Sequence, residues 1–357
     1  MQLSRQNNFD IIRLLAALQV VYVHATKHLH WPASESNSVM YYVSEFIERF
    51  PGVPIFFVVS GFLVYWSLER NKDNLRRFFK NRVLRIFPGL WFCLIITIAL
   101  FFVFNIIDIE KSFSKNFIVW VLGQISFFQF YTPDLLREFG VGTPNGSLWT
   151  ITVELQFYLL LPILFILIHK FKRLTHKNLC LLSIVLLSLV FAYFIKINYT
   201  SDTLIGKLGK VNILTYLYNF VFGIMIFINW DYIKKYIINK AVYWILLYVI
   251  YVVLFYFVGN LYGKGYVPNL FGIIGFFILS VLTISVAYSK PNISKFLRGN
   301  DISYGVYIYH MLVINTLIEL NINTKLSFLL TFVLTVLFGF ISWKVIEKPS
   351  LRFKNKW

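Results

Sequence analysis

Charged residues are scarce in this 357-residue chain, where Asp, Glu, Lys and Arg together account for 14% of the positions. A soluble domain of this length carries about 25% charged residues. Hydrophobic residues make up 58% and aromatic residues 19% of the chain. The polar surface is therefore too small to cover a globule in water, and the composition predicts an integral membrane protein.

Acidic residues are the scarcer kind of charge: 16 Asp and Glu stand against 34 Lys and Arg, for a net charge of +18. A basic surplus can indicate nucleic-acid binding. Here the basic residues lie between apolar segments rather than in one basic domain, which is typical of loops that fix membrane topology. We therefore expect membrane lipid around the protein and no nucleic-acid partner.

Cysteine is nearly absent as well, since only Cys93 and Cys180 occur and both lie inside apolar segments. This excludes a disulfide framework and any Cys-based metal motif. The first apolar run is followed by His28 and Pro32 rather than by a small-residue cleavage site, so we do not expect a cleaved signal peptide.

Long apolar runs are abundant, and about 20 such residues cross a membrane as a helix. The candidates are 9–29, 51–68, 83–106, 149–169, 179–197, 212–229, 241–259, 267–288, 302–319 and 326–346. A further apolar stretch, 117–131, is shorter. The sequence predicts an all-α polytopic membrane bundle of about ten transmembrane helices, forming a single domain over 1–357.

Lys and Arg concentrate in alternate loops, and cytoplasmic loops carry this excess. The basic segments are 69–82, 170–177, 234–240, 290–298 and the tail 348–356. All ten spans then alternate with both termini in the cytoplasm, provided that 117–131 does not cross. We expect that stretch to be a re-entrant or interfacial segment.

Ionisable residues inside apolar spans are costly and mark candidate functional sites. Arg13 and His24 share a helix face, because eleven residues at about 100° each make three turns plus about 20°. Both could instead be interfacial residues, with Asp10 as the ion-pair partner of Arg13. His24 and His28 have the i, i+4 spacing of a helical zinc site, but no third ligand accompanies them and we expect no metal.

Two further ionisable residues lie within spans. Glu154 lies about 7–8 Å from the outer end of its span, at a depth close to that of His24. A carboxylate at that level could orient the imidazole and raise its basicity, or it could bond Tyr158 for packing. His310 lies about 12 Å from the cytoplasmic end of its span, and a lone histidine among aromatic residues favours a structural role.

Arg82 and Arg85 share a face at the inner mouth of the third predicted span. They either anchor the topology or clamp a phosphate, since guanidinium groups bind phosphates bidentately. We expect Asp301 and the lysines of the inner loops to be solvated. Glycine and proline at 51–54 and 60–62 are tolerated at membrane depth where the backbone lines a cavity, which indicates a cleft.

Together, these residues resemble acyltransferase family 3, bacterial membrane proteins that O-acylate surface glycans. The resemblance runs nearly end to end and rests on motifs in order: Arg13-x10-His24, Phe56-Phe57-Val58-Val59-Ser60-Gly61-Phe62, Arg82-x-x-Arg85, Ser147-Leu148-Trp149 with Glu154, Tyr158 and Pro162, Ser303-Tyr304-x-x-Tyr307-x-x-His310, and Glu347-Lys348-Pro349. The chain stops after the last span, so we expect no soluble esterase-like domain of the kind fused to some members.

This resemblance implies a membrane O-acetyltransferase of the bacterial inner membrane. Cytoplasmic acetyl-CoA would be the donor co-substrate, with its nucleotide held by Arg13, Arg82 and Arg85. His24 would act as general base on an acceptor hydroxyl, oriented by Glu154, or would form an acetyl-histidine intermediate. Substrate or oxyanion contacts would come from three more residues: Ser60, Tyr307 and His310.

The acceptor is expected to be a hydroxyl of a surface polysaccharide or lipid-linked saccharide, such as O-antigen, capsule or exopolysaccharide. Acyl transfer to peptidoglycan or to a small molecule is an alternative that the residues do not separate from the first. A saccharide transporter or flippase is a further alternative. The inverted repeats typical of transporters are not evident in the sequence.

Overall fold

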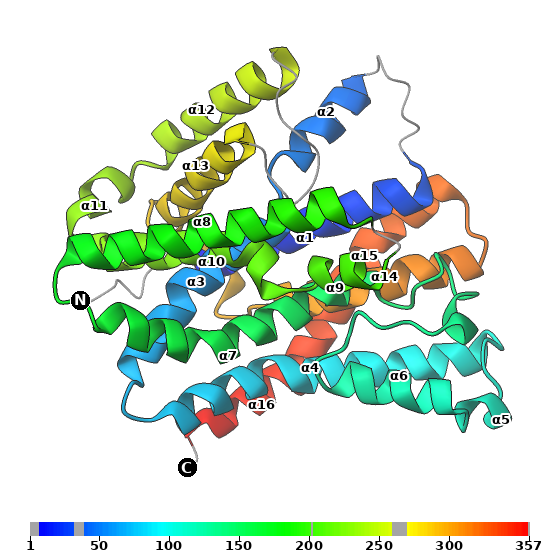
Figure 1. Ribbon diagram of the computed structural model, residues 1–357. Coiled ribbons are helices and arrows are strands. Elements are labelled where there is room, and N and C mark those ends of the chain that lie inside the picture. The colour runs from blue at the N-terminus through cyan, green and yellow to red at the C-terminus, as the bar shows by residue number, and fades with distance from the viewer. Residues whose placement is uncertain (1–6, 32–38, 201–202, 259–269, 356–357) are drawn as a thin grey trace. The chain divides into compact units, whose positions relative to one another are not determined.

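The structure is a computed structural model that describes residues 7–31, 39–200, 203–258 and 270–355, and all regular elements in these ranges are helical (Figure 1). The α-helices are α1 (Phe9–Leu29), α2 (Val39–Glu48), α3 (Gly52–Arg70), α4 (Leu75–Val103), α5 (Ile109–Ser112), α6 (Lys115–Ile125), α7 (Trp149–His169), α8 (Leu174–Asn198), α9 (Leu204–Lys210), α10 (Ile213–Ile228), α11 (Trp230–Ile237), α12 (Ala241–Val252), α13 (Leu270–Ala287), α14 (Ser303–Glu319), α15 (Thr324–Ser342) and α16 (Lys348–Arg352). Short 3-10 or π segments are η1 (Asp134–Leu136), η2 (Gly146–Leu148), η3 (Val253–Val258), η4 (Ile293–Leu297), η5 (Trp343–Glu347) and η6 (Phe353–Asn355).

Within the described residues, the apolar stretches predicted from the sequence correspond to these helices. Position 259 of one predicted span and positions 267–269 of the next lie outside the described residues. By length and composition, seven helical segments within the described residues can cross a membrane, and an eighth can if α11 and α12, bent by 82°, count as one span. The two remaining predicted spans are α13 with 18 residues and α14 with 17. The predicted polytopic all-α membrane bundle is confirmed.

The short apolar stretch 117–131 contains one short helix, and its re-entrant or interfacial placement stays a prediction. Its helix, α6, has 11 residues and starts at Lys115, after the N-cap residue Ser114, whose hydroxyl accepts from the backbone N–H of Phe117. Eleven residues rise about 16 Å, which is about half of the hydrocarbon thickness. The segment is therefore too short to cross as a single helix.

The chain divides into two compact units built from interleaved segments, which are described separately. Unit 1 comprises Met1–Arg13, Val53–Leu75 and Val153–Gly299, and unit 2 comprises Leu14–Gly52, Arg76–Thr152 and Asn300–Trp357. Both boundaries at 13/14 and 152/153 fall inside a helix, α1 and α7 respectively. The single-domain organisation stays a prediction.

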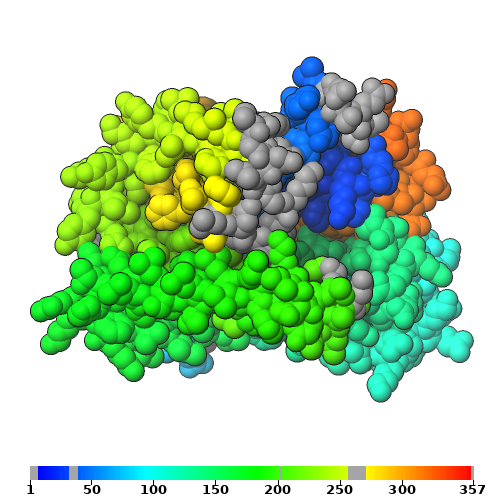
Figure 2. Space-filling view, turned by 45° about the horizontal axis from the view of Figure 1, so that its top comes forward, coloured from blue at the N-terminus to red at the C-terminus, as the bar shows by residue number. Residues whose placement is uncertain are grey.

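In unit 1, α10 packs against α8 and α13, and glycines bring α10 against α3. A Cβ at Gly61 would lie 2.0 Å from the Phe220 carbonyl oxygen, and one at Gly223 would lie 2.2 Å from that of Val58. Small residues permit such backbone contact between membrane helices. The outer surfaces of α8 (green) and α12 (yellow-green) face the viewer in Figure 2 and expose many large apolar side chains, as expected for surfaces in lipid.

In unit 2, α14 is the central helix and is buried along nearly its whole length. It packs along α15, beside it in Figure 1, where a Cβ at Gly305 would lie 2.7 Å from the Cα of Gly339. Tyr304 on α14 reaches α4 and donates its hydroxyl to the Ile86 carbonyl at 2.9 Å. These contacts fix the position of the helix that carries His310.

The expectation that Asp301 is solvated was wrong. Its side chain is buried just before α14, with 7% of the residue exposed, and it accepts a hydrogen bond from Arg85 at 2.5 Å. The buried carboxylate needs that cation, because an unpaired charge at this depth is costly. In addition, α4 begins at Leu75, so both arginines of the Arg82-x-x-Arg85 motif lie within the helix rather than at its start.

Candidate active site

Two histidines far apart in the sequence meet in unit 2. His24 on α1 and His310 on α14 have ring centroids 4.9 Å apart, with an angle of 70° between the rings. The Nδ1 atom of His24 lies 3.3 Å from the Nε2 atom of His310. The apolar residues that hold α1 against α14 at this level are Ala25, Leu29, Met311 and Ile314.

The environment of the two rings differs. His310 is fully buried, and its Nδ1 lies 2.6 Å from the backbone carbonyl oxygen of Tyr307. His24 is partly exposed, and its Nδ1 also lies 2.9 Å from the Met311 sulfur. Within the described part of the chain, the Nε2 atom of His24 makes no hydrogen bond. His24 therefore presents one ring nitrogen to the protein and leaves the other available.

The hydroxyl of Tyr307 is engaged elsewhere. It donates to the Ser147 carbonyl oxygen at 3.0 Å and lies 2.6 Å from the Thr150 hydroxyl. These bonds tie η2 and the first turn of α7 to α14. An oxyanion role for Tyr307 would require this hydroxyl to release the Ser147 carbonyl.

The predicted partner of His24, Glu154, belongs to a cluster in unit 1. Its Oε1 accepts a hydrogen bond from the Ser60 hydroxyl at 3.0 Å and another from the Tyr158 hydroxyl. The packing alternative considered for Glu154 thus describes its contacts in this unit. Since His24 belongs to unit 2, orientation of the imidazole by Glu154 stays a prediction.

Two of the three arginines assigned to the donor nucleotide form ion pairs with aspartates. Arg13 pairs with Asp10 at 3.3 Å, as the sequence suggested, and both side chains are partly exposed. Arg85 pairs with Asp301 and lies over the ring of Trp343, with its guanidinium carbon 5.8 Å from the ring centre. Arg82 lies one turn earlier on the same face of α4.

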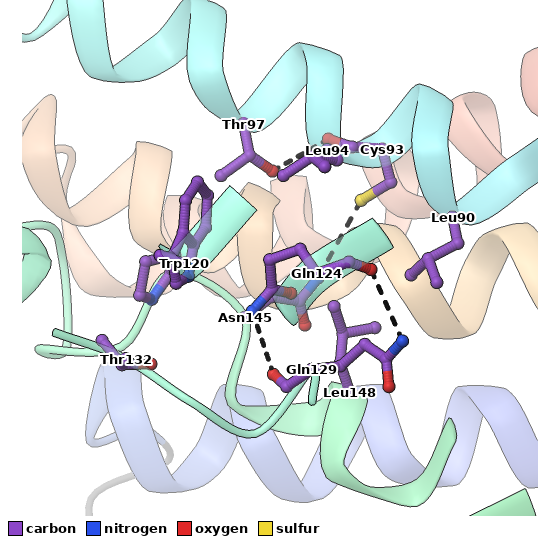
Figure 3. A pocket seen from close by; sticks show the side chains of 11 residues that line it. Leu90, Cys93, Leu94, Thr97, Trp120, Gln124, Gln129, Thr132, Asn145 and Leu148 are labelled. Carbon is purple, nitrogen blue, oxygen red and sulfur yellow. Dashed lines mark hydrogen bonds between the residues drawn. The ribbon is translucent and has the colours of Figure 1, made fainter. Parts of the chain in front are cut away.

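A small polar cavity lies beside α14 in unit 2 (Figure 3). Thr97 and Cys93 of α4 line it together with Gln124 of α6, and the cavity has room for about one water molecule. Asn145 also lines it and donates to the Ile308 carbonyl at 2.7 Å. The Asn145 bond attaches the 126–148 segment to α14, and the cavity itself is too small for a substrate.

The sequence treated His310 as an isolated histidine and missed its pairing with His24. One available signal was the motif that runs from Ser303 to His310. It places His310 on the same helix as Ser303, Tyr304 and Tyr307, whose polar groups mark a functional helix. Within the described residues, no group of three or more His, Cys, Asp or Glu side chains could hold a metal ion.

A multi-span helical bundle with an imidazole pair among its buried helices belongs to the class of membrane proteins that can perform acid–base chemistry. Residues 6–344 match the family model described as an acyltransferase domain. The chain belongs to acyltransferase family 3, and it is a multi-pass membrane O-acyltransferase.

Several characterised proteins are similar to this chain. Nodulation protein 10 of Rhizobium leguminosarum bv. viciae is 31% identical over 361 residues, covering 99% of this chain and 95% of that protein. An O-acetyl transferase of Shigella phage Sf6 is 27% identical, covering 98% and 97%. The O-acetyltransferase OatA of Staphylococcus aureus is 27% identical over 84% of this chain, which spans about half of OatA, 52%. No solved structure matches the chain.

Proposed function

We propose that the protein transfers an acetyl group from cytoplasmic acetyl-CoA to a hydroxyl of a cell-surface polysaccharide or lipid-linked saccharide. The O-acetyltransferases among its relatives support acetyl as the transferred group. The basic loops support a location in the bacterial inner membrane with both termini in the cytoplasm. Acetyl-CoA is made on that side, whereas surface glycans are accessible from the other.

One observation above all supports a transfer reaction: a partly exposed imidazole, His24, has one ring nitrogen held by the protein and the other available. In the proposed reaction, Nε2 of His24 accepts the proton of the acceptor hydroxyl. The hydroxyl oxygen attacks the thioester carbonyl, the carbon–sulfur bond breaks, and the CoA thiolate leaves and takes up the proton. The products are the acetyl ester and free CoA.

The donor nucleotide is assigned to Arg13, Arg82 and Arg85, because guanidinium groups bind phosphates in bidentate fashion. Arg85 already binds Asp301, so a phosphate would have to share or replace that carboxylate. Glu154 remains the proposed orienting partner of His24, and Ser60 remains a proposed donor to the oxyanion. Both would have to exchange their present bond to each other for these roles.

The direct test combines a gene deletion with a single variant. Mass spectrometry of surface glycans should show acetyl groups lost on deletion, restored by the wild-type gene and not restored by His24→Ala. Membrane insertion of the variant, followed by detergent extraction and gel filtration, controls for folding. Full glycan acetylation with His24→Ala would contradict the assigned base.

The same experiment separates the alternative functions. If acetyl groups are lost from peptidoglycan or from a small metabolite instead, the acceptor assignment is wrong while the chemistry holds. A transporter would change the position of a glycan without consuming thioester. Release of CoA thiol from acetyl-CoA by the purified full-length chain therefore distinguishes the enzyme from a flippase.

A further inference from the structure

We propose that His310 is a positioning residue that fixes the tautomer of His24, so that the Nε2 atom of His24 carries the free lone pair. This inference rests on the proposed function, in which His24 is the base. It follows from two consecutive hydrogen bonds whose direction is set by chemistry. His310 is thereby assigned a role different from the substrate contact expected from the sequence.

The first bond joins the Nδ1 atom of His310 and the Tyr307 carbonyl oxygen, at 2.6 Å. A carbonyl oxygen can only accept, so the hydrogen lies on Nδ1. In a neutral imidazole, the other ring nitrogen is then an acceptor. The Nε2 atom of His310 therefore offers a lone pair toward its neighbour.

The second bond joins that lone pair and the Nδ1 atom of His24, at 3.3 Å. Nδ1 of His24 must donate, and the Met311 sulfur, 2.9 Å from the same atom, demands the same because a thioether has no hydrogen to give. Two neighbours thus place the hydrogen of His24 on Nδ1. The lone pair of His24 is left on Nε2, the nitrogen that makes no hydrogen bond among the described residues.

This arrangement has the logic of a catalytic triad, in which a second group holds the imidazole of the base in the productive tautomer. Here the second group is a neutral imidazole anchored to a backbone carbonyl. His310 is fully buried, and its helix is packed on all sides in unit 2, so the anchor has little freedom to turn. A fixed anchor is what a directional hydrogen bond requires.

Amide side chains of two lengths test the two hydrogen bonds of His310 separately, the bond to the Tyr307 carbonyl and the bond to His24. We call these two bonds the relay. In His310→Gln, the terminal oxygen lies near the former Nε2 position and can accept from His24. In His310→Asn, the amide can donate to the Tyr307 carbonyl but leaves His24 without its acceptor. We expect kcat to fall by at least about 10- to 100-fold in His310→Asn, the range seen for partners that orient a metal-ligating histidine, and much less in His310→Gln.

The assay uses purified full-length protein, acetyl-CoA, and glycan extracted from the host with the gene deleted. Because the proposed role gives His310 no contact with the donor, the KM for acetyl-CoA should change by less than about twofold in both variants. If His310 had a purely structural role, both variants would lose kcat to a similar extent and would also lose thermal stability. Equal kcat values for the Asn and Gln variants would overturn the inference.

A chemical rescue tests the tautomer itself. Nδ1-methylhistidine at position 24 carries its lone pair on Nε2 whatever its neighbours do. The methyl group needs the space of both side chains that face Nδ1, so it is combined with His310→Ala and Met311→Ala. We expect this combination to be more active than the His310→Ala/Met311→Ala variant with an ordinary histidine at position 24. No gain in kcat would contradict the proposal.

A measurement on the wild-type protein avoids variants that fold poorly. In protein labelled with ¹⁵N at histidine, the signal of His24, assigned by its loss in His24→Gln, should show Nδ1 protonated and Nε2 bare. The reverse assignment would refute the relay. Failure of the proposed function has a separate signature, because the wild-type chain would then release no CoA thiol from acetyl-CoA.

Discussion

Replacing Gly61 by alanine should loosen unit 1 by a calculable amount. The added Cβ would lie 2.0 Å from the Phe220 carbonyl oxygen, whereas ordinary contact begins at 3.4 Å, so α3 and α10 would have to separate by about 1.4 Å. The obstacle is the backbone of a packed helix, which cannot rotate away as a side chain can. Overpacking of this kind costs about 1–3 kcal/mol, and backbone contact favours the upper end.

The higher helix propensity of alanine offsets part of this overpacking cost. Alanine is favoured over glycine by about 1 kcal/mol in a helix interior, which leaves a net loss of about 2 kcal/mol. At about 2.1 cal/mol/K of unfolding entropy per residue, that corresponds to a decrease in Tm of roughly 3 °C for a chain of this size. Fluorescence-detected unfolding of the detergent-solubilised protein would measure it.

Gly146 provides the matched control, because a Cβ there would have its nearest neighbour at 3.6 Å, an ordinary contact. Gly146→Ala should change Tm by less than about 1 °C. Gly223→Ala should behave like Gly61→Ala, since its Cβ would lie 2.2 Å from the Val58 carbonyl oxygen on the same pair of helices. A Tm for Gly61→Ala as high as that of the Gly146 variant would refute the reasoning.

Two predictions concern the site. Arg82→Ala and Arg85→Ala should each raise the KM for acetyl-CoA about 10-fold through lost charge-assisted bonds, while the KM for S-acetylpantetheine, which has no nucleotide, stays unchanged. Arg85→Ala should also lower the Tm, because it leaves the buried Asp301 carboxylate without its cation. Unaltered KM values for both donors would leave the two arginines with a structural or topological role. Tyr307→Phe should lower the free energy of unfolding by about 0.5–1.5 kcal/mol, with little effect on kcat, because the Ser147 carbonyl loses one donor and keeps the Thr150 hydroxyl. A large fall in kcat at unchanged Tm would instead favour Tyr307 as an oxyanion donor.

Much of the fold could be predicted from the sequence, because lipid imposes a simple constraint on it. A run of about 20 apolar residues has few stable alternatives to a helix, and basic loops mark where such runs end. The ion pair between Asp10 and Arg13 was also foreseeable, since both residues lie one turn apart on one helix. Such features depend on residues close together in the chain.

The pairing of His24 with His310 could not be predicted in the same way. The depth of a residue, counted from the end of its apolar run, assumes that every helix begins at the membrane surface. By that measure His310 lies about 12 Å deep and His24 about 22 Å from the start of α1, which separates them. The structure brings them to 3.3 Å because α14 begins inside the protein: Asp301 and Ser303 at its start are both buried. The expectation that Asp301 is solvated failed for the same reason.

An N-terminal end placed inside unit 2 explains why α14 can serve as a rigid support for chemistry. Several polar contacts along it are made with other elements: Asp301 just before it pairs with Arg85 of α4, and Tyr307 in its middle donates to the Ser147 carbonyl. Toward its end, Asn315 accepts from the Val141 N–H and Glu319 from the Gly140 N–H.

These bonds are spread over the length of the helix and lie on different elements of unit 2, so rotation or sliding of α14 would break several at once. Breaking a buried hydrogen bond costs more free energy than forming it contributes. The two separated groups remain buried and cannot bond water instead. A buried helix held in this way keeps His310 at a fixed height and angle. The directional bond to His24 requires that precision, which a lone histidine on a lipid-facing helix would lack.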